Sequence, residues 1–292
     1  MSDKEFKTID EQLNILISRG LIVNDTEKAK TFLLHNNYYR ISGYSLTLRK
    51  HDVFSETSTF QNIIDIYSFD HELRHILLKY IEIIEVTLKS VYAYKFTEKH
   101  GALGYLESSF FTDTEKHKEI IEKAEKQKFM RLPHEAYLKH FIDDLHQDVP
   151  FWAYVDLLTI SDISFLYSIS EKDIKKSVAD EFGLHFKRGS DILGHFMHSI
   201  TIIRNLCAHG SRLFNRLFEQ KPSLNRDEQS LLIRNDGIID NSHLYGFIII
   251  MRRLLPDNDF TELKNSIIDI TQKYPFVSMK YYGFRDDWKD VL

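Results

Sequence analysis

The chain has little cysteine, glycine and proline, and each shortage excludes a class of fold or site. Its single cysteine, Cys207, rules out an intrachain disulfide framework and any zinc site made of several cysteines, and it suits a reducing cytoplasm. The 11 glycines and 5 prolines among 292 residues are below average usage, which argues against a turn-rich all-β fold. We therefore expect a cytoplasmic protein made mainly of long helices.

The sequence also lacks a secretory leader, a long apolar run and a basic net charge. No charged and then apolar segment opens the chain, and the longest apolar run, 247–251, is far too short to span a bilayer. The formal net charge of −5 gives no overall field that would attract nucleic acid. Any contact with RNA must therefore come from a local basic patch, and no membrane contact is expected.

Helical periodicity dominates what is present. One long helix is expected from Phe60 to about Glu98, because apolar residues recur along it at steps of three and four and Thr59 can cap its start. Two short helices precede it, and residues 36–50 are expected to form a turn with a short extended piece. Later helices are expected at about 113–128, 133–146, 150–159, 161–169, 171–182, 190–218, 242–255 and 259–273. The expected fold class is therefore all-α.

The stretch His71–His75 has the letters HExxH, the signature of zinc peptidases. On a helix both histidines share a face, but a zinc site of this kind needs a third protein ligand. One large group of these enzymes has a third histidine at the position that corresponds to Ile81 in this chain. Glu82 lies about 10.5 Å from His75 along the helix axis. A more distant ligand such as Glu98 stays open. We favour two histidines on the polar flank of a helix, with a zinc metallopeptidase as the remote alternative.

A second candidate site lies in "RNLCAHGSRLFNR", residues 204–216. If the helix continues through this stretch, one polar stripe holds Asn205, His209, Arg212 and Arg216, with Arg204 at its edge. Histidine can take a proton from a ribose 2′-hydroxyl, and arginine can neutralise the charge of the transition state. This set predicts RNA transesterification without a metal, because the nucleophile belongs to the substrate. A helix face with a structural histidine is the other interpretation.

The spacing of arginine and histidine is not specific by itself. About two matches to Arg-x4–6-His are expected by chance in a chain of this composition. A second match runs from Arg188 to His195, but it spans Gly189 and Gly194, so we discount it as a catalytic pair.

Several blocks of the chain, taken in order, resemble one known family. They are "SRGLIV", "NYYRISGY", "FQNIIDIYSFDHELRHILLKYIEIIEVTLKS", "PFWAYVDLLTISDISFLY" and "IRNLCAHGSRLFNR". Together they resemble the Abi_2 (AbiD/AbiF-like) abortive-infection proteins, which are bacterial anti-phage proteins of the HEPN superfamily. The similarity covers roughly residues 8–222, and the tail from about 223 resembles nothing that we can name.

The resemblance implies a HEPN-type helical bundle. It suggests an N-terminal helical and turn subdomain (1–55), the bundle itself (56–222) and a C-terminal helical extension packed on it (223–292). It also implies an endoribonuclease toxin that needs no metal or cofactor and that commonly acts as a homodimer with the two motifs facing each other. Some systems of this kind include a small structured RNA that restrains the toxin. RNA is therefore expected as substrate and, in such systems, as antitoxin.

Residue roles follow from position within the resemblance. The expected catalytic residues are Arg204, Asn205 and His209. Supporting or RNA-binding roles are expected for Asp70, Arg74, Glu85, Arg212, Arg216 and Arg40. Of these, Glu85 could reach the helix of His209 and orient its side chains, and the plainer alternative for Asp70 and Arg74 is an i,i+4 ion pair worth a few tenths of a kcal/mol.

One departure from the family concerns the residue after His209. Gly210 stands where many relatives have a second histidine, and glycine inside a helix costs up to about 1 kcal/mol relative to alanine. We therefore expect the helix to bend just after His209. A catalytically silent HEPN protein that binds RNA or another protein is the alternative function.

Overall fold

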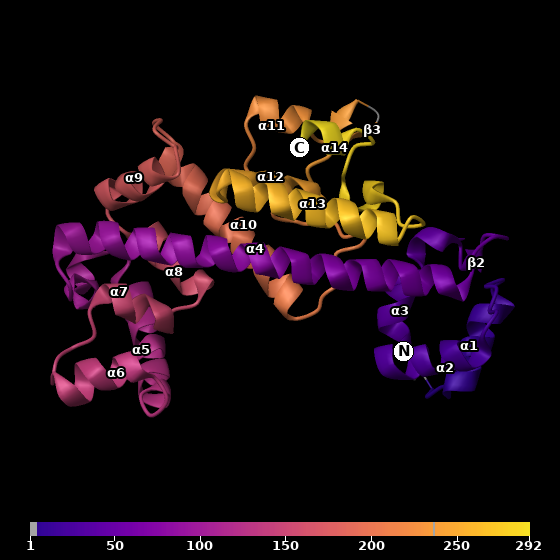
Figure 1. The fold of residues 1–292 in the computed structure, drawn as a ribbon, viewed down its shortest axis with the longest axis horizontal. Coiled ribbons are helices and arrows are strands. Elements are labelled where there is room, and N and C mark those ends of the chain that lie inside the picture. The colour runs from indigo at the N-terminus through magenta and orange to yellow at the C-terminus, as the bar shows by residue number, and fades with distance from the viewer. Residues whose placement is uncertain (1–4, 236) are drawn as a thin grey trace.

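The protein is built around one long helix. The computed structural model describes residues 5–235 and 237–292, and in this part of the chain helices dominate while the strands form only two short antiparallel ribbons. The helix α4 (Phe60–His100) runs the length of the molecule, with α1 to α3 at one end and α5 to α9 at the other (Figure 1). The expected all-α class is confirmed.

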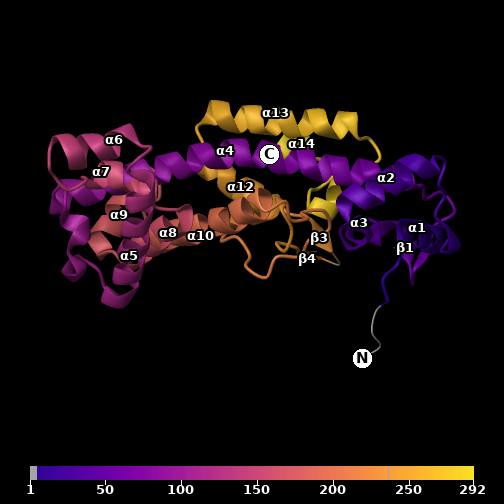
Figure 2. The same ribbon diagram turned by 90° about the horizontal axis from the view of Figure 1, so that it is seen from below.

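Helix α4 forms where the sequence predicts it. Thr59 accepts a hydrogen bond from the backbone N–H of Asn62, whose side chain accepts one from the backbone of Thr59, so a complete capping box starts the helix. Its apolar stripe is buried against α13 (Asp257–Lys273), α10 (Gly189–Ala208) and α12 (Tyr245–Leu254). Figure 2 shows α4 between α13 on one side and α10 and α12 on the other. This central position lets α4 contact both the motif-bearing helix and the C-terminal part.

The N-terminal segment contains one helix that the sequence did not predict. Helices α1 (Ile9–Ser18) and α2 (Thr26–Asn36) are where they are expected, but residues 38–44 form helix α3 (Tyr38–Tyr44) and not a turn. Asn37 starts α3 from a backbone angle φ of 61°, and its side chain accepts a hydrogen bond from the backbone N–H of Tyr39 at 2.9 Å. The expected extended piece follows as β1 (Arg49–Lys50), paired with β2 (Val53–Phe54).

A second group of helices packs at the far end of α4. It includes α5 (Thr114–Arg131), α6 (Ala136–Lys139), a π-helix (His140–Asp144), α7 (Phe151–Tyr154), α8 (Ile160–Ile169) and α9 (Lys172–Glu181). Short 3-10 helices connect them at Gly104–Leu106, Ser108–Phe110 and Val155–Leu157, and another lies near the N-terminal ribbon at Leu46–Leu48. These helices lie close to their expected ranges, and Gly183, with φ of 69°, follows the end of α9.

The C-terminal part returns along the middle of α4. It contains α11 (Arg226–Ser230), the ribbon of β3 (Arg234–Asn235) and β4 (Ile238–Ile239), α12, α13, a 3-10 helix (Met279–Tyr282) and α14 (Trp288–Val291). A single cluster of buried apolar side chains extends from Leu13 to Leu292. The three-part division of the chain stays a prediction. None of the helices in the described ranges has the length and apolar character needed to cross a membrane.

Candidate functional site

The helix that carries the arginine and histidine motif ends at the motif. Helix α10 stops at Ala208, and Gly210 adopts a left-handed φ of 63°. The backbone N–H of Gly210 donates to the carbonyl of Cys207 at 3.0 Å, and that of Ser211 donates to the carbonyl of Leu206 at 2.8 Å. This pair of bonds is a Schellman motif, in which glycine is favoured because it adopts positive φ without a clash. Gly210 therefore ends the helix, whereas a bend within a longer helix was expected.

This helix end overturns the expected polar stripe. Arg212 and Arg216 do not continue the helical face of Asn205 and His209, because residues 211–218 form an irregular segment that we call the motif loop. The Arg212 guanidinium donates to the carbonyls of Phe214 and Asn215, the latter at 3.4 Å. The Arg216 guanidinium donates to the carbonyl of Arg212 at 3.5 Å. Both arginines therefore satisfy carbonyls of the loop in which they lie.

The expected catalytic residues occupy the last two turns of α10. The Arg204 guanidinium forms an ion pair with Glu85 of α4, with Nε 3.7 Å from the carboxylate, and donates to the side-chain oxygen of Asn205 at 3.4 Å. Glu85 also pairs with Lys89 at 3.1 Å. The structure thus brings Glu85 against the motif helix, as the sequence suggested, although its partner there is Arg204.

His209 is the C-cap residue of α10, and its side chain is exposed. Its backbone N–H donates to the carbonyl of Asn205 at 3.0 Å. Within the described ranges its imidazole has no hydrogen bond or ion pair. The ring is therefore open to contact by a ligand.

A buried carboxylate anchors the motif loop to α4. Asp70 is 0% exposed and accepts hydrogen bonds from the backbone N–H groups of Leu213 at 3.2 Å and Phe214 at 2.8 Å. Its oxygens also accept from the hydroxyls of Tyr44 at 2.7 Å and Tyr282 at 3.0 Å. A buried charge is tolerated when several donors satisfy it, and Asp70 has donors from four separate residues besides its arginine partner.

Arg74 completes this anchor. It is 2% exposed, forms an ion pair with Asp70, and donates to the carbonyl of Ser211 at 3.4 Å and to the hydroxyl of Tyr44 at 3.3 Å. The expected ion pair is present, but it is buried and not on the surface, so neither residue is placed to touch RNA. Burial raises the pKa of the Tyr44 hydroxyl, and the negative charge of Asp70 adds to the effect, so Tyr44 stays protonated as a donor.

Arg40 of α3 reaches the motif from the other side. Its guanidinium donates to the carbonyl of Gly210 and lies 5.6 Å from the ring centroid of Tyr67. The neighbouring Gly43 lies so close to the loop that an added Cβ would be 3.1 Å from Nε of Arg212. Helix α3 therefore packs against the motif loop, and Arg40 contacts the residue that follows His209.

The C-terminal part supplies residues that sequence reasoning missed. The Tyr282 hydroxyl donates to Asp70, and the backbone carbonyl of the neighbouring Tyr281 accepts a hydrogen bond from the backbone N–H of Asn215 at 3.0 Å. The backbone N–H of Phe218 donates to the carbonyl of Ser242 at 2.7 Å. In the sequence these tyrosines were visible only as part of an aromatic tail. No local pattern indicates that a residue near the C-terminus reaches a carboxylate on α4.

The HExxH stretch lies next to the anchor but faces outward. His71 and His75 are exposed, and Glu72 accepts hydrogen bonds from Lys273 and Tyr274, each at 2.6 Å. Across residues 5–235 and 237–292, no three histidine, cysteine, aspartate or glutamate side chains cluster closely enough to hold a metal ion. The carboxylate that a peptidase would use as a base is thus bound to α13 and the residue after it.

The site therefore defines a class: an all-α protein in which an exposed histidine closes a core helix and a buried carboxylate anchors the loop that follows. Residues 31–215 match the sequence model of the family described as Abi-like protein, a stretch that includes Asp70, Arg204 and His209. The match covers more than half of the chain, and the chain belongs to this family. Membership suggests a role in abortive-infection defence. Comparisons with curated proteins and with solved structures give no match.

Proposed function

We propose that the chain is a metal-independent endoribonuclease toxin that cleaves RNA during abortive-infection defence. The observation that carries the proposal is the exposed imidazole of His209 at the C-cap of the helix whose last turns carry Arg204 and Asn205. The backbone that follows is held by Arg40 and Asp70. The resemblance to HEPN proteins supports the same three residues. The contacts of Arg40 and Asp70 hold the backbone at His209, which limits where its side chain can meet a substrate, and misplacement of reacting groups costs rate.

The chemistry follows from the side chains present. His209 would take the proton of the ribose 2′-hydroxyl, which attacks the adjacent phosphorus, and a histidine would return a proton to the departing 5′-oxygen. The P–O5′ bond breaks as the P–O2′ bond forms, so the products are a 2′,3′-cyclic phosphate and a 5′-hydroxyl. Arg204 would stabilise the additional negative charge of the transition state, and Glu85 would position its guanidinium. The substrate supplies the nucleophile, so no metal is needed.

A second copy of the chain fits this chemistry. Arg204 and His209 are five positions apart, so on a helix that turns by about 100° per residue they point in directions about 140° apart. A homodimer with the two motifs facing each other would add a second His209 and a second Arg204 to one cleft. We expect a homodimer for this reason. A small structured RNA that binds in the same cleft would block the substrate and so restrain the toxin.

The test is cleavage of a labelled RNA in EDTA by the wild type and by His209→Ala, with His35→Ala as an exposed-histidine control on α2. We expect the wild type and the control to cut, with cyclic-phosphate products, and His209→Ala to lose at least about 100-fold in rate. An RNA with 2′-deoxyribose at the cut position should resist. Cleavage that persists in His209→Ala, or that needs a metal, would contradict the proposal.

A binding protein without catalysis is the second candidate function. It is favoured by one observation, namely that the Arg204 guanidinium already pairs with Glu85 and Asn205. If those contacts persist in the presence of RNA, Glu85 already balances the charge of Arg204, which leaves less of it to stabilise a transition state. RNA binding without cleavage by the wild type, unchanged in His209→Ala, would identify this function.

A further inference from the structure

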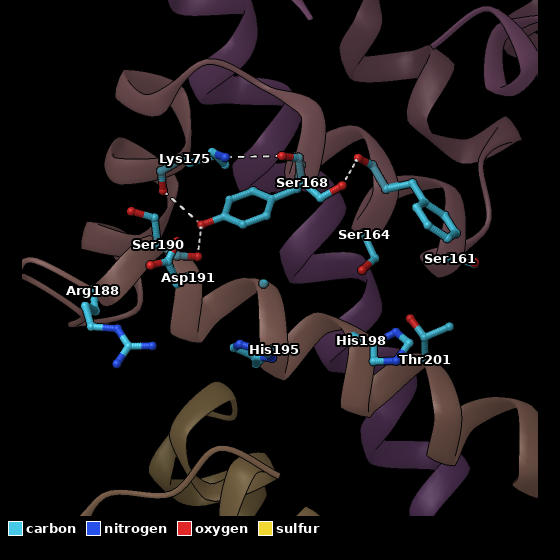
Figure 3. Close-up of a pocket in the computed structure, with 13 residues that line it drawn as sticks. Ser161, Ser164, Ser168, Lys175, Arg188, Ser190, Asp191, His195, His198 and Thr201 are labelled. Atoms are coloured by element: carbon cyan, nitrogen blue, oxygen red, sulfur yellow. Dashed lines mark hydrogen bonds between the residues drawn. The ribbon is translucent and has the colours of Figure 1, made fainter. Parts of the chain in front are cut away.

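A groove between α8 and α10 has the features of a second nucleic-acid site. Its volume is about 490 Å³, and both α8 and α10 contribute to its lining. Figure 3 shows Arg188, His195 and His198 following one another along the α10 side. We propose that this groove binds the phosphodiester backbone of single-stranded RNA. The inference rests on the proposed function only in taking RNA as the ligand, because it concerns binding and not cleavage.

The lining offers hydrogen-bonding groups that the protein itself does not use. In the described part of the chain the side chains of Arg188, His195 and His198 have no hydrogen bond or ion pair, and neither do the hydroxyls of Ser161 and Ser164. Guanidinium, imidazole and hydroxyl groups are the donors that proteins direct at phosphate and ribose oxygens. The unpaired donors thus match a ligand rich in acceptors.

The charge of the lining agrees with a polyanion, although the whole chain is acidic. Lys175 and Arg188 are the cations, and Asp191 is the acidic side chain that lines the groove among the described residues. The ammonium of Lys175 donates to the carbonyl of Ser168 at 3.1 Å, which fixes it at the groove wall. The groove is therefore a local basic feature of the kind that an acidic protein needs in order to bind RNA.

An exposed aromatic ring distinguishes an RNA strand from a free phosphate. Phe165 of α8 lines the groove and is 46% exposed, with Nζ of Lys116 4.7 Å from its ring centroid. Proteins that bind single strands combine cations along the backbone with aromatic rings on which bases stack. A free phosphate ion has no base that could stack on such a ring.

The groove is also aligned with the motif. Residues 195, 198, 202, 205 and 209 follow one another at steps of three and four, so they share one face of α10 up to its C-cap. His195 and His209 are about 21 Å apart along the helix axis. A single strand that extends along this face would contact the groove while a phosphate farther along lies at His209.

The experiment measures fluorescence anisotropy of a labelled 2′-O-methyl RNA of about 16 nucleotides. This RNA lacks the free 2′-hydroxyl, so the readout does not depend on cleavage. We expect Phe165→Ala to raise Kd about fivefold or more, and Arg188→Ala to reduce the slope of log K against log salt by about 0.7. The exposed control variants Phe129→Ala and Arg226→Ala should leave both quantities unchanged.

Other outcomes overturn the proposal. Unchanged Kd and salt slope in both groove variants would do so, whatever the cleavage assay shows. A fall in molecular mass in these variants, with unchanged RNA affinity, would make the groove an interface between copies of the chain. Binding of orthophosphate or a mononucleotide that depends on Arg188, without an effect on RNA, would make it a small-anion site. If RNA binding depends on the groove but His209→Ala still cleaves RNA as the wild type does, only the proposed function is rejected.

Discussion

Two pairs of residues with the same spacing lie one position apart on α4 and have opposite surroundings. Asp70 and Arg74 are 0% and 2% exposed and hold the motif loop, whereas His71 and His75 are exposed. A step of one residue turns a side chain by about 100°, which is enough to move from the core to solvent. The two histidines of HExxH therefore face outward, and each residue that organises the site precedes one of them by a single position.

The largest expected effect comes from breaking the buried pair. Asp70→Ala leaves the Arg74 guanidinium buried without its partner and removes the acceptor of two loop N–H groups, so the free energy of unfolding should fall by about 3–5 kcal/mol. Urea unfolding measures this. His71→Ala, one position away, is the matched control and should change stability by about 0.5 kcal/mol or less.

Asp70→Asn keeps an acceptor oxygen but loses the charge, so its effect should lie between those of Asp70→Ala and the control. This milder variant keeps the comparison measurable if Asp70→Ala does not fold. Equal effects of Asp70→Asn and His71→Ala would show that the anchor is not what distinguishes the two faces.

A smaller effect is expected at the C-terminal donor of the anchor. Tyr282→Phe removes one hydrogen bond to a charged acceptor and should cost about 1.5–3 kcal/mol. The exposed Tyr94 of α4 provides the control, because Tyr94→Phe lies outside the core. If the proposed function holds, Tyr282→Phe should also slow RNA cleavage, since the loop after His209 loses part of its support. A stability loss no larger than that of Tyr94→Phe would remove Tyr282 from the anchor.

The smallest effect concerns the exposed pair and pH. Partial burial lowers the pKa of His71, and the neighbouring charges of His75 and Arg74 lower it further, so the unfolded chain binds this proton more readily than the folded one. The stability that His71 contributes is present above its unfolded pKa of about 6.5 and is lost as pH falls from there toward the folded pKa.

His71→Gln should therefore reduce the loss of stability between about pH 8 and pH 5, by about 0.5 kcal/mol or less because solvent screens the group. Urea unfolding of the variant and the wild type across this range measures the difference. A steeper pH dependence in His71→Gln than in the wild type would contradict a lowered pKa for this histidine.

Local pattern in the sequence predicted the central helix and the place of the motif. The capping residue Thr59 and the apolar stripe beyond it predicted α4, and the sequence placed Arg204, Asn205 and His209 on one later helix, although not at its end. The end of α10 was missed because the polar spacing beyond His209 matched a helix, and the left-handed preference of Gly210 was treated only as a cost. The glycine itself was the available signal, because glycine just after a helix favours the positive φ that ends it.

Other features could not be read from local pattern. Tyr282 is separated from Asp70 by 212 positions, and no spacing rule connects them. The burial of Asp70 and Arg74 depends on α3, on the motif loop and on the C-terminal part, which cover them only in the folded chain. The apolar stripe was therefore predictable as the buried side of α4, but the burial of the charged pair next to that stripe was not.

The decisive measurement is cleavage of RNA in EDTA by His209→Ala and by His75→Ala, compared side by side. We expect His75→Ala to cut as the wild type does and His209→Ala to leave the RNA intact. Cleavage in EDTA that His209→Ala retains would contradict the assignment of the site to the end of α10, and so would an activity that appears only when zinc replaces EDTA and that His75→Ala loses.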